Sequence, residues 1–285
     1  MLLSCALLFA LFVPSSAPAQ NPRPKARETD GNKLVQVALK SDRDGLRAGD
    51  TFQLCVVLDV KPRWHVYWEN AGDAGTPTNV EVSGPKGFEF GTPRFPCPAR
   101  HEEEGDIVSY IHEGQLLVLV DAKAPKDLVA GAALEFRVDA EWLVCTEYCL
   151  PGTGRATLTL ASAAADSTPK PLETELFTKA RAAEPRAWKD VLGDAKPVLE
   201  TLGDGRSRVV IDVQGATELE FFPWTSAHTK LLSRERSKTQ TGARIVLELE
   251  QINGSADVDY RGVLWIRDAT GAKSCLQEAW RPAKR

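Results

Sequence analysis

The sequence predicts a mainly β protein: an antiparallel β-sandwich followed by a second, smaller β-rich domain. Three observations favour this class. Short segments of alternating apolar and polar residues recur along the chain, turn signals such as Ala48-Gly49-Asp50 separate them, and helical periodicity is almost absent before residue 161. Period-two alternation between turns is typical of antiparallel sheets whose strands each present one face to a core.

The N-terminus predicts a secretory signal peptide over residues 1–19. An apolar run from Leu2 to Val13 precedes the small-residue pattern Ala17-Pro18-Ala19. The run is shorter than the roughly 20 apolar residues that span a bilayer. No Lys or Arg precedes it, so the true start codon stays open. We expect an exported protein, in the periplasm or secreted, with no membrane insertion after signal cleavage.

The remaining chain divides into two predicted domains. Residues 20–32 are rich in Pro and charged side chains, and we expect a disordered lead-in there. The first domain covers 33–160, with predicted strands at 33–39, 52–60, 115–120, 134–144 and 156–160. A small, polar segment at 161–170 predicts a linker. The second domain covers 171–285, with a short helix at 171–183 and strands at 208–213, 218–222, 245–249 and 263–267.

Charge and cysteine content narrow the function classes. The net charge of -4 gives no electrostatic basis for nucleic-acid binding. Beyond the signal peptide, five cysteines remain: Cys55, Cys97, Cys145, Cys149 and Cys275. An odd number in an oxidising compartment leaves at least one thiol free or paired between molecules. Cys55 is expected to be a small buried hydrophobe or a bridge partner. Cys97 is expected to bond Cys55, fill an apolar gap or stay a free thiol, and Cys275 has no predicted role.

The stretch "WLVCTEYCLPG" (Trp142 to Gly152) places Cys145 and Cys149 four positions apart. Four steps along a straight strand cover about 13 Å, too far for a disulfide, so the chain must turn between them. A loop this short adds little stability when it is closed, which favours a reactive pair. Three interpretations stay open: a redox dithiol, an inert structural disulfide, or a metal site. A Cu(I) site would draw a further ligand from His65, His101 or His112.

Three stretches together resemble a known family. They are "RWHVYWENAGDAGTPTNVEV" (63–82), "GTPRFPCPAR" (91–100) and "AEWLVCTEYCLPG" (140–152). Their order resembles the N-terminal periplasmic domain of the thiol:disulfide interchange protein family DsbD, and the branch that includes the suppressor-of-copper-sensitivity protein ScsB. The resemblance covers about 33–160. Within it, Trp64, Tyr67, Trp68 and Trp142 are predicted to be core residues, and Gly72, Asp73 and Gly75 a tight turn with local Asp73 hydrogen bonds.

The resemblance implies an immunoglobulin-like sandwich with Cys145 and Cys149 as its active pair and no cofactor. Such a pair accepts electrons from a membrane-embedded thiol carrier and passes them to periplasmic thioredoxin-like or disulfide-containing proteins. Cys149 is favoured as the cysteine that forms the mixed disulfide. A cap loop would fall at Glu103 to Tyr110, with Ile107 or Tyr110 as the lid side chain.

The sequence also departs from the longer family members. These continue into a transmembrane carrier and a thioredoxin-like domain, which are not part of this sequence. The electron donor is therefore expected to be a separate protein, and the chain a component of a thiol–disulfide oxidoreductase system linked to copper tolerance. The alternative is a Cu(I)-binding or scaffold module on the same fold, with a structural disulfide.

Overall fold

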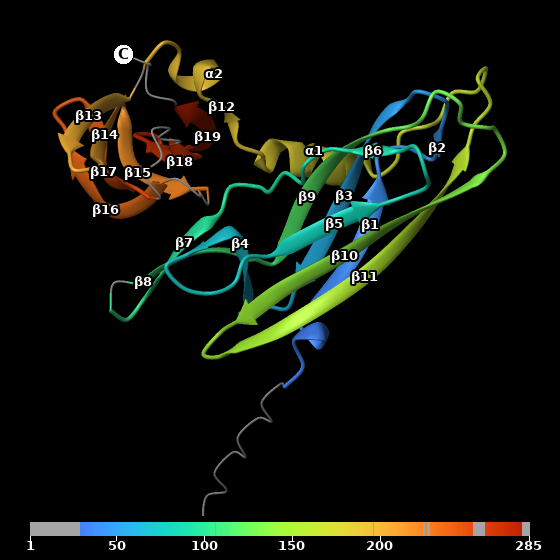
Figure 1. Cartoon of the computed structure of the whole chain (residues 1–285), viewed down its shortest axis with the longest axis horizontal. Coiled ribbons are helices and arrows are strands. Elements are labelled where there is room, and N and C mark those ends of the chain that lie inside the picture. Colours follow the sequence, from blue (N-terminus) through green and yellow to red (C-terminus); the bar gives the residue numbers. More distant parts are fainter. Residues whose placement is uncertain are drawn as a thin grey trace, which may run out of the picture.

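The computed structural model describes residues 29–105, 107–195, 197–224, 226, 229–252 and 260–280. Two β units make up the molecule, and Figure 1 shows the elongated first unit beside the smaller second one. The predicted signal peptide at 1–19 lies outside the described residues. None of the helices in the described part of the chain has the length and apolar composition that a membrane span requires.

The first unit is a sandwich of two sheets. The first sheet has the order β1-β3-β9-β6, with bounds Val35–Ser41, Thr51–Val60, Gln115–Lys123 and Glu89–Phe90. The second has the order β2-β11-β10-β4-β8-β7, and β5 pairs with β10 beside β4. Its strands are β2 Gly45–Leu46, β11 Cys149–Ser162, β10 Ala133–Cys145, β4 His65–Gly72, β8 Ile107–Glu113, β7 Ala99–Glu103 and β5 Asn79–Ser83.

Strand β10 shows why this sequence forms the sandwich. Its apolar residues from Leu134 to Val144 recur at every second position and are buried, while the residues between them are more exposed. Each of the larger of these side chains, such as Phe136, stabilises the fold by about 1.5–3 kcal/mol when it is removed from water. The mainly β, sandwich class predicted from the alternation is confirmed.

Helix α1, Thr174–Ala183, covers the outer face of strands β3 and β9. Its Phe177 and Ala180 pack on Cys55, Val57 and Leu119, so β3 is apolar on both faces. Cys55 is therefore the small buried hydrophobe that was one of its two predicted roles. It is a free thiol, and burial raises its pKa to about 12.

The second unit is also built from two sheets. Their orders are β12-β19-β18-β15 and β13-β14-β17-β16. The first four strands are Arg186–Ala187, Lys273–Trp280, Tyr260–Asp268 and Ala216–Pro223; the second four are Val198–Gly203, Arg206–Gln214, Gly242–Gln251 and Thr229–Lys238. A short helix α2, Trp188–Leu192, follows β12 and precedes the other seven strands. At the other end of the described chain, residues 31–33, at the boundary of the predicted lead-in, form a 3-10 turn η1 (Gly31–Lys33) capped by Asp30.

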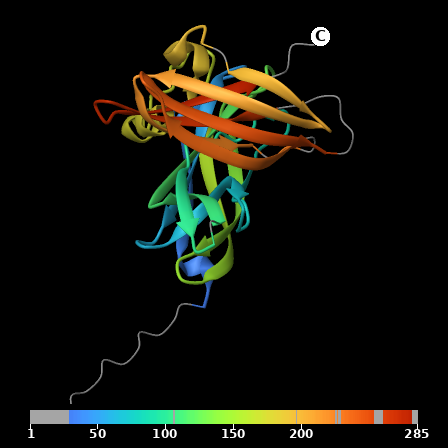
Figure 2. The same cartoon turned by 90° about the vertical axis from the view of Figure 1, so that its left-hand side faces the viewer.

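The two units pack directly on each other (Figure 2). Phe222 and Val263 of the second unit belong to the hydrophobic core of the first. A disulfide between Cys97 and Cys275 also links the units across 178 positions of sequence. Cys97 therefore neither bonds Cys55 nor stays a free thiol, although it does pack against the core as a half-buried side chain. Its partner is the one cysteine for which the sequence suggested no role. No local pattern signals a bond between residues so far apart.

Candidate functional site

The disulfide Cys145–Cys149 closes the end of the β10–β11 hairpin. The two cysteines are direct cross-strand partners, and their Cα atoms are 4.1 Å apart. The turn between them runs through Thr146, Glu147 and Tyr148, with a hydrogen bond of 3.0 Å from the Thr146 N–H to the Tyr148 carbonyl. The structure thus contains the turn that the four-residue spacing required.

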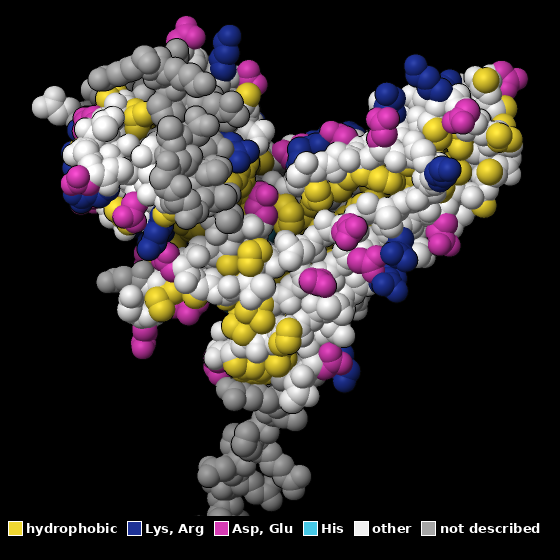
Figure 3. Space-filling view, in the orientation of Figure 1, with side chains coloured by type: hydrophobic (Ala, Val, Ile, Leu, Met, Phe, Trp, Pro, Cys, Tyr) yellow, Lys and Arg dark blue, Asp and Glu magenta, His cyan; other side chains and the backbone are white. Residues whose placement is uncertain are grey.

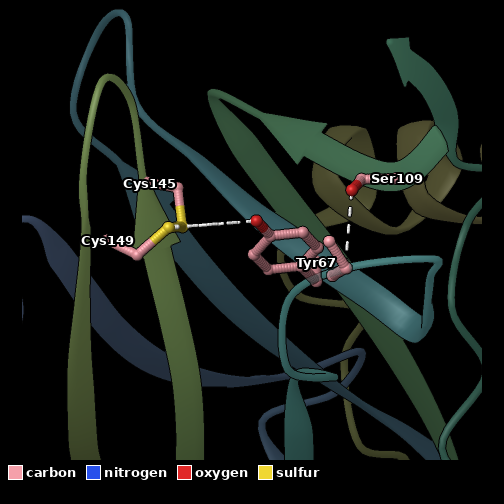
Figure 4. The surroundings of a disulfide bond; sticks show 5 residues. Tyr67, Ser109, Cys145 and Cys149 are labelled. Carbon is pink, nitrogen blue, oxygen red and sulfur yellow. Dashed lines mark hydrogen bonds between the residues drawn. A yellow bond between two sulfur atoms is a disulfide. The ribbon is translucent and has the colours of Figure 1, made fainter. Parts of the chain in front are cut away.

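The two sulfurs have different surroundings. Cys145 is 2% exposed, whereas Cys149 is exposed at the end of the hairpin. The Tyr67 hydroxyl lies 3.3 Å from Cys145 Sγ, toward which it donates a hydrogen bond, and 4.0 Å from Cys149 Sγ. Figure 4 shows the Tyr67 ring pointing at the disulfide from the adjacent strand. Burial, and then the negative charge of Glu103, raises the pKa of Tyr67, so the hydroxyl keeps its proton. An attacking thiolate can reach Cys149 more easily than Cys145.

A loop after β4 holds Tyr67 in place. Gly75 has φ +95°, and a Cβ there would lie 2.2 Å from the Tyr67 ring, so only glycine allows this approach. Asp73 fixes the loop to β8: its N–H donates to the Val108 carbonyl (2.9 Å), and its carboxylate accepts from the Val108 N–H (3.0 Å). The Ser109 hydroxyl adds a bond of 3.4 Å to the Ala74 carbonyl (Figure 4). The glycines form the predicted turn, but Asp73 bonds a distant strand instead of its local backbone.

His65 is the cross-strand partner of Cys145 on strand β4. Its side chain is 5% exposed, and its ring centre lies 5.5 Å from that of Tyr67 and 5.0 Å from that of His101. Burial lowers the pKa of His65, and His101 lowers it further, against the opposing effect of Glu113 and Glu103. The group beside the disulfide is thus a neutral imidazole.

The three candidate Cu(I) ligands do not converge. His112 is paired with Val66 and points to the opposite face of the sheet from His65. It is buried, and this burial lowers its pKa to about 3. Among the described residues, no three or more His, Cys, Asp or Glu side chains are grouped so that they could hold a metal ion.

The predicted cap segment is a hairpin instead of an irregular loop. Ile107 and Tyr110 are three positions apart on β8 and so point to opposite faces. Tyr110 is 1% exposed and packs against Phe222 at 5.0 Å between ring centres, with its hydroxyl accepting from Arg234 at 2.6 Å. It lies between the two units, which corrects its predicted lid role. Ile107 is 37% exposed and shares its face of β8 with Ile111, which packs near Cys145.

Sequence reasoning missed the part played by Tyr67, which it assigned to core packing. The residue is indeed buried, at 2% exposure. Its hydroxyl nevertheless reaches Cys145 because strands β4 and β10 are neighbours in the sheet. That neighbourhood is a property of the strand order and leaves no local mark in the sequence.

Hydrophobic side chains gather on the surface around the end of this hairpin (Figure 3). The half-buried Trp64 lies edge-to-face against Tyr148 of the turn, with ring centres 5.2 Å apart. An exposed sulfur with an apolar border beside it suits contact with another protein. The fold and the site together define a thiol–disulfide exchange module on a β-sandwich.

The comparisons with known proteins agree with this class. Residues 36–161 match the family model of the thiol:disulfide interchange protein DsbD, N-terminal. The resemblance noted in the sequence is confirmed. No match was found among curated protein sequences.

Solved structures extend the comparison to the fold. The N-terminal periplasmic domain of ScsB from Proteus mirabilis aligns over 89% of this chain and 96% of its own, with 11% identity and a TM-score of 0.56. The two chains therefore share a fold across both units. The DsbD N-terminal domain of Neisseria meningitidis in its reduced form aligns over 50% of this chain and 92% of its own, with 10% identity and a TM-score of 0.28.

Proposed function

We propose that the protein relays reducing equivalents outside the cytoplasm through the Cys145–Cys149 pair. The observation that carries the proposal is the asymmetry of the pair: Cys149 is exposed, and Cys145 is buried against the Tyr67 hydroxyl. Thiol–disulfide exchange needs one accessible sulfur and a second that leaves and later resolves the mixed disulfide. The family match over 36–161 supports the same chemistry.

The reduction of the pair proceeds in two displacements. A thiolate of the electron donor attacks Cys149 Sγ, a new S–S bond forms, and the Cys145–Cys149 bond breaks with its electron pair on Cys145. The donor's second thiolate then attacks its own sulfur in the mixed disulfide, and Cys149 leaves as a thiolate. The donor ends as a disulfide, and the pair has gained two electrons and, from solvent, its protons. The same steps in reverse reduce a substrate disulfide, with Cys149 attacking and Cys145 resolving.

Tyr67 assists the step in which Cys145 leaves. Its hydroxyl already lies 3.3 Å from Cys145 Sγ, and a hydrogen bond to a charged sulfur is stronger than one to a neutral sulfur. The thiolate that forms in this buried position is therefore stabilised as charge develops. Burial lowers the pKa of His65, so the imidazole is neutral and Tyr67 is the group that stabilises the thiolate. Ile107, on the outer face of β8, is the remaining candidate for a lid over the pair.

The donor in this proposal is a separate membrane-embedded thiol carrier, and the acceptors are periplasmic thioredoxin-like or disulfide-containing proteins. Export would depend on the signal peptide predicted at residues 1–19. The link to copper tolerance rests on the resemblance to ScsB-type proteins.

Two single-cysteine variants test the asymmetry. In Cys145→Ser the exposed Cys149 remains, and in Cys149→Ser only the buried Cys145 remains; Cys55 is buried in both. We expect a small aromatic disulfide to modify Cys145→Ser much faster than Cys149→Ser. The reduction potential of the intact pair, measured in graded thiol/disulfide buffers, should lie near roughly -200 to -270 mV. A potential below about -300 mV, typical of structural disulfides, would exclude the relay.

A further inference from the structure

A second site lies between the two units. A cleft of about 740 Å³ is lined by Arg100 and Glu102 of strand β7 on one side and by strands of the second unit on the other. Among its described lining residues, six are Lys or Arg (Arg100, Arg236, Lys238, Arg244, Arg267 and Lys273) and three are Glu (Glu102, Glu218 and Glu220). The chain as a whole carries a net charge of -4. We propose that this cleft binds a small organic anion with an apolar body.

The positive charge of the cleft is only partly neutralised from within. Glu220, which is 4% exposed, is shared by three guanidinium groups: Arg100 at 2.9 Å, Arg236 at 3.0 Å and Arg234 at 3.4 Å. One buried carboxylate cannot balance three cations, although Glu102 also pairs with Arg100. Of the other cleft arginines, Arg244 is neutralised by Asp212, at 2.6 and 2.7 Å. A bound anion would offset the excess charge.

Two lysines at the cleft have no anionic partner in the part of the chain that the structure describes. Lys238 and Lys273 are exposed, and neither has an ion pair or side-chain hydrogen bond among the described residues. Lysines in this state can turn toward a ligand without giving up an existing contact. They supply attraction for an anion from the open side of the cleft.

The cleft also has an apolar wall. Trp265 is half-buried, and the Arg267 guanidinium lies over its ring at 5.3 Å from the ring centre. Arg267 donates from Nη1 to Glu218 at 3.3 Å, but its buried Nε has no partner among the described residues. Phe222 lines the same space. The unpaired Arg267 Nε beside the Trp265 ring fits a ligand that has both a charged group and a flat apolar body. The volume of the cleft is in the range of small-molecule pockets.

This site is separate from the redox pair. On β7, Arg100 and Glu102 point to one face, while His101 and Glu103 point to the face that carries His65. The Cys97–Cys275 disulfide lies beside the cleft instead. Pro98, which follows Cys97, lines the cleft, and Trp265 is the cross-strand partner of Cys275. The disulfide therefore holds the two walls of the cleft at a fixed separation.

Calorimetric titration of the purified full chain with naphthalenesulfonate tests the proposal. Sodium sulfate supplies the charge without the apolar body, and naphthol supplies the body without the charge. We expect naphthalenesulfonate to bind with a Kd below about 1 mM and both controls to bind more weakly. Added salt should weaken the binding, because the attraction is electrostatic.

Matched lysine variants locate the site. Lys238→Ala/Lys273→Ala should bind the probe about tenfold more weakly, since two charges at the cleft are removed. Lys61→Ala/Lys86→Ala removes two exposed lysines from the sandwich, outside the cleft, and should leave the affinity unchanged. Equal affinities of the two double variants, or no binding to the unaltered protein, would overturn the proposal.

The disulfides provide an independent readout. Because one of them fixes the walls of the cleft, Cys97→Ser/Cys275→Ser should weaken probe binding, whereas Cys145→Ser/Cys149→Ser should not. Loss of binding in the second variant alone would move the probe to the redox face and contradict the proposed site. Probe binding in these variants is measured without any redox partner, so the test of the cleft is independent of the proposed relay.

Discussion

The two disulfides of this chain connect very different parts of the molecule. Cys145–Cys149 joins two residues that are four positions apart in the sequence. They lie on neighbouring strands at the end of a hairpin. Cys97–Cys275 joins the two β units across 178 positions. In the chain-entropy description, closing the short loop stabilises the fold by about 2 kcal/mol and closing the long one by about 5 kcal/mol. The fold therefore depends less on the Cys145–Cys149 disulfide than on Cys97–Cys275.

The surroundings of the two disulfides also indicate that Cys145–Cys149 is the more reactive one. Cys149 is exposed, and its partner sulfur receives a hydrogen bond from Tyr67. Cys97 and Cys275 are half-buried against the core of the sandwich, and the Cys97 N–H is bound to the Ala183 carbonyl at 3.2 Å. Thiol–disulfide exchange is favoured at Cys145–Cys149, because Cys149 is accessible and Cys145 is a stabilised leaving group. Exchange is disfavoured at Cys97–Cys275, because both cysteines pack against the core. From their positions in the fold, the two disulfides are predicted to have different roles.

The largest expected effect comes from removing the bond between the units. Cys97→Ser/Cys275→Ser should lower the free energy of unfolding by about 5 kcal/mol, because the unfolded chain regains the freedom of a long loop. Urea unfolding followed by tryptophan fluorescence measures the loss. If the two units then unfold in separate transitions, the first midpoint should shift most. A loss no larger than that of the hairpin variant would contradict the structural role of this bond.

Removing the hairpin bond should have a smaller effect on stability and a complete effect on exchange. Cys145→Ser/Cys149→Ser is expected to lose about 2 kcal/mol or less. It should also show no thiol–disulfide couple at moderate potential, while Cys97→Ser/Cys275→Ser retains one. Thiol trapping across graded redox buffers compares the variants. A moderate-potential couple that survives in the hairpin variant would assign the exchange to another cysteine.

Sequence patterns predicted those elements whose two faces differ. Strand β10 alternates between buried and exposed residues and was predicted almost to its ends. Strand β4 was not predicted, because His65, Val66, Tyr67 and Trp68 are all buried and period-two alternation disappears. One face of β4 packs in the core, and the other is covered by the loop that contains Gly75. A strand covered on both sides gives no alternation.

The site was predictable where neighbours in sequence are also neighbours in space. The spacing of Cys145 and Cys149 required a turn, and the turn is present. Tyr110 was misplaced as a lid because its face depends on where strand β8 begins, and that start was unknown. The Cys97–Cys275 bond depends on how the two units dock, which no local segment encodes.

A smaller effect per pH unit should come from His112, which points to the opposite face of the sheet from His65 and Cys145. Burial lowers its pKa from 6.5 to about 3, so between these values only the unfolded chain takes up the proton. Stability should therefore fall as pH decreases from 6.5 toward 3, by about 1.4 kcal/mol per pH unit. Urea midpoints across this range measure the slope.

The variant His112→Leu should reduce that slope. It should not remove it completely, because burial also lowers the pKa of His65 and gives a contribution of the same sign. Unchanged pH dependence in His112→Leu would mean that the histidine is protonated in the folded protein. The slope is expected to be the same with the Cys145–Cys149 pair oxidised or reduced, since His112 faces away from it.

The smallest expected effect is a shift in the reduction potential of the Cys145–Cys149 pair when one hydroxyl group is removed. Tyr67→Phe removes the donor 3.3 Å from Cys145 Sγ and keeps the ring that packs on Gly75. At alkaline pH, where the reduced Cys145 has lost its proton, the hydrogen bond stabilises the reduced pair more than the disulfide, because it is stronger when the sulfur is charged. Loss of this hydrogen bond, about 1 kcal/mol, should make the reduction potential of the pair about 20 mV more negative.

The control variant is Tyr148→Phe, which removes a hydroxyl group from the hairpin turn itself and should shift the reduction potential less. If Tyr67→Phe shifts the potential no more than Tyr148→Phe, the asymmetry of the pair rests on exposure alone, and the buried tyrosine has only a packing role.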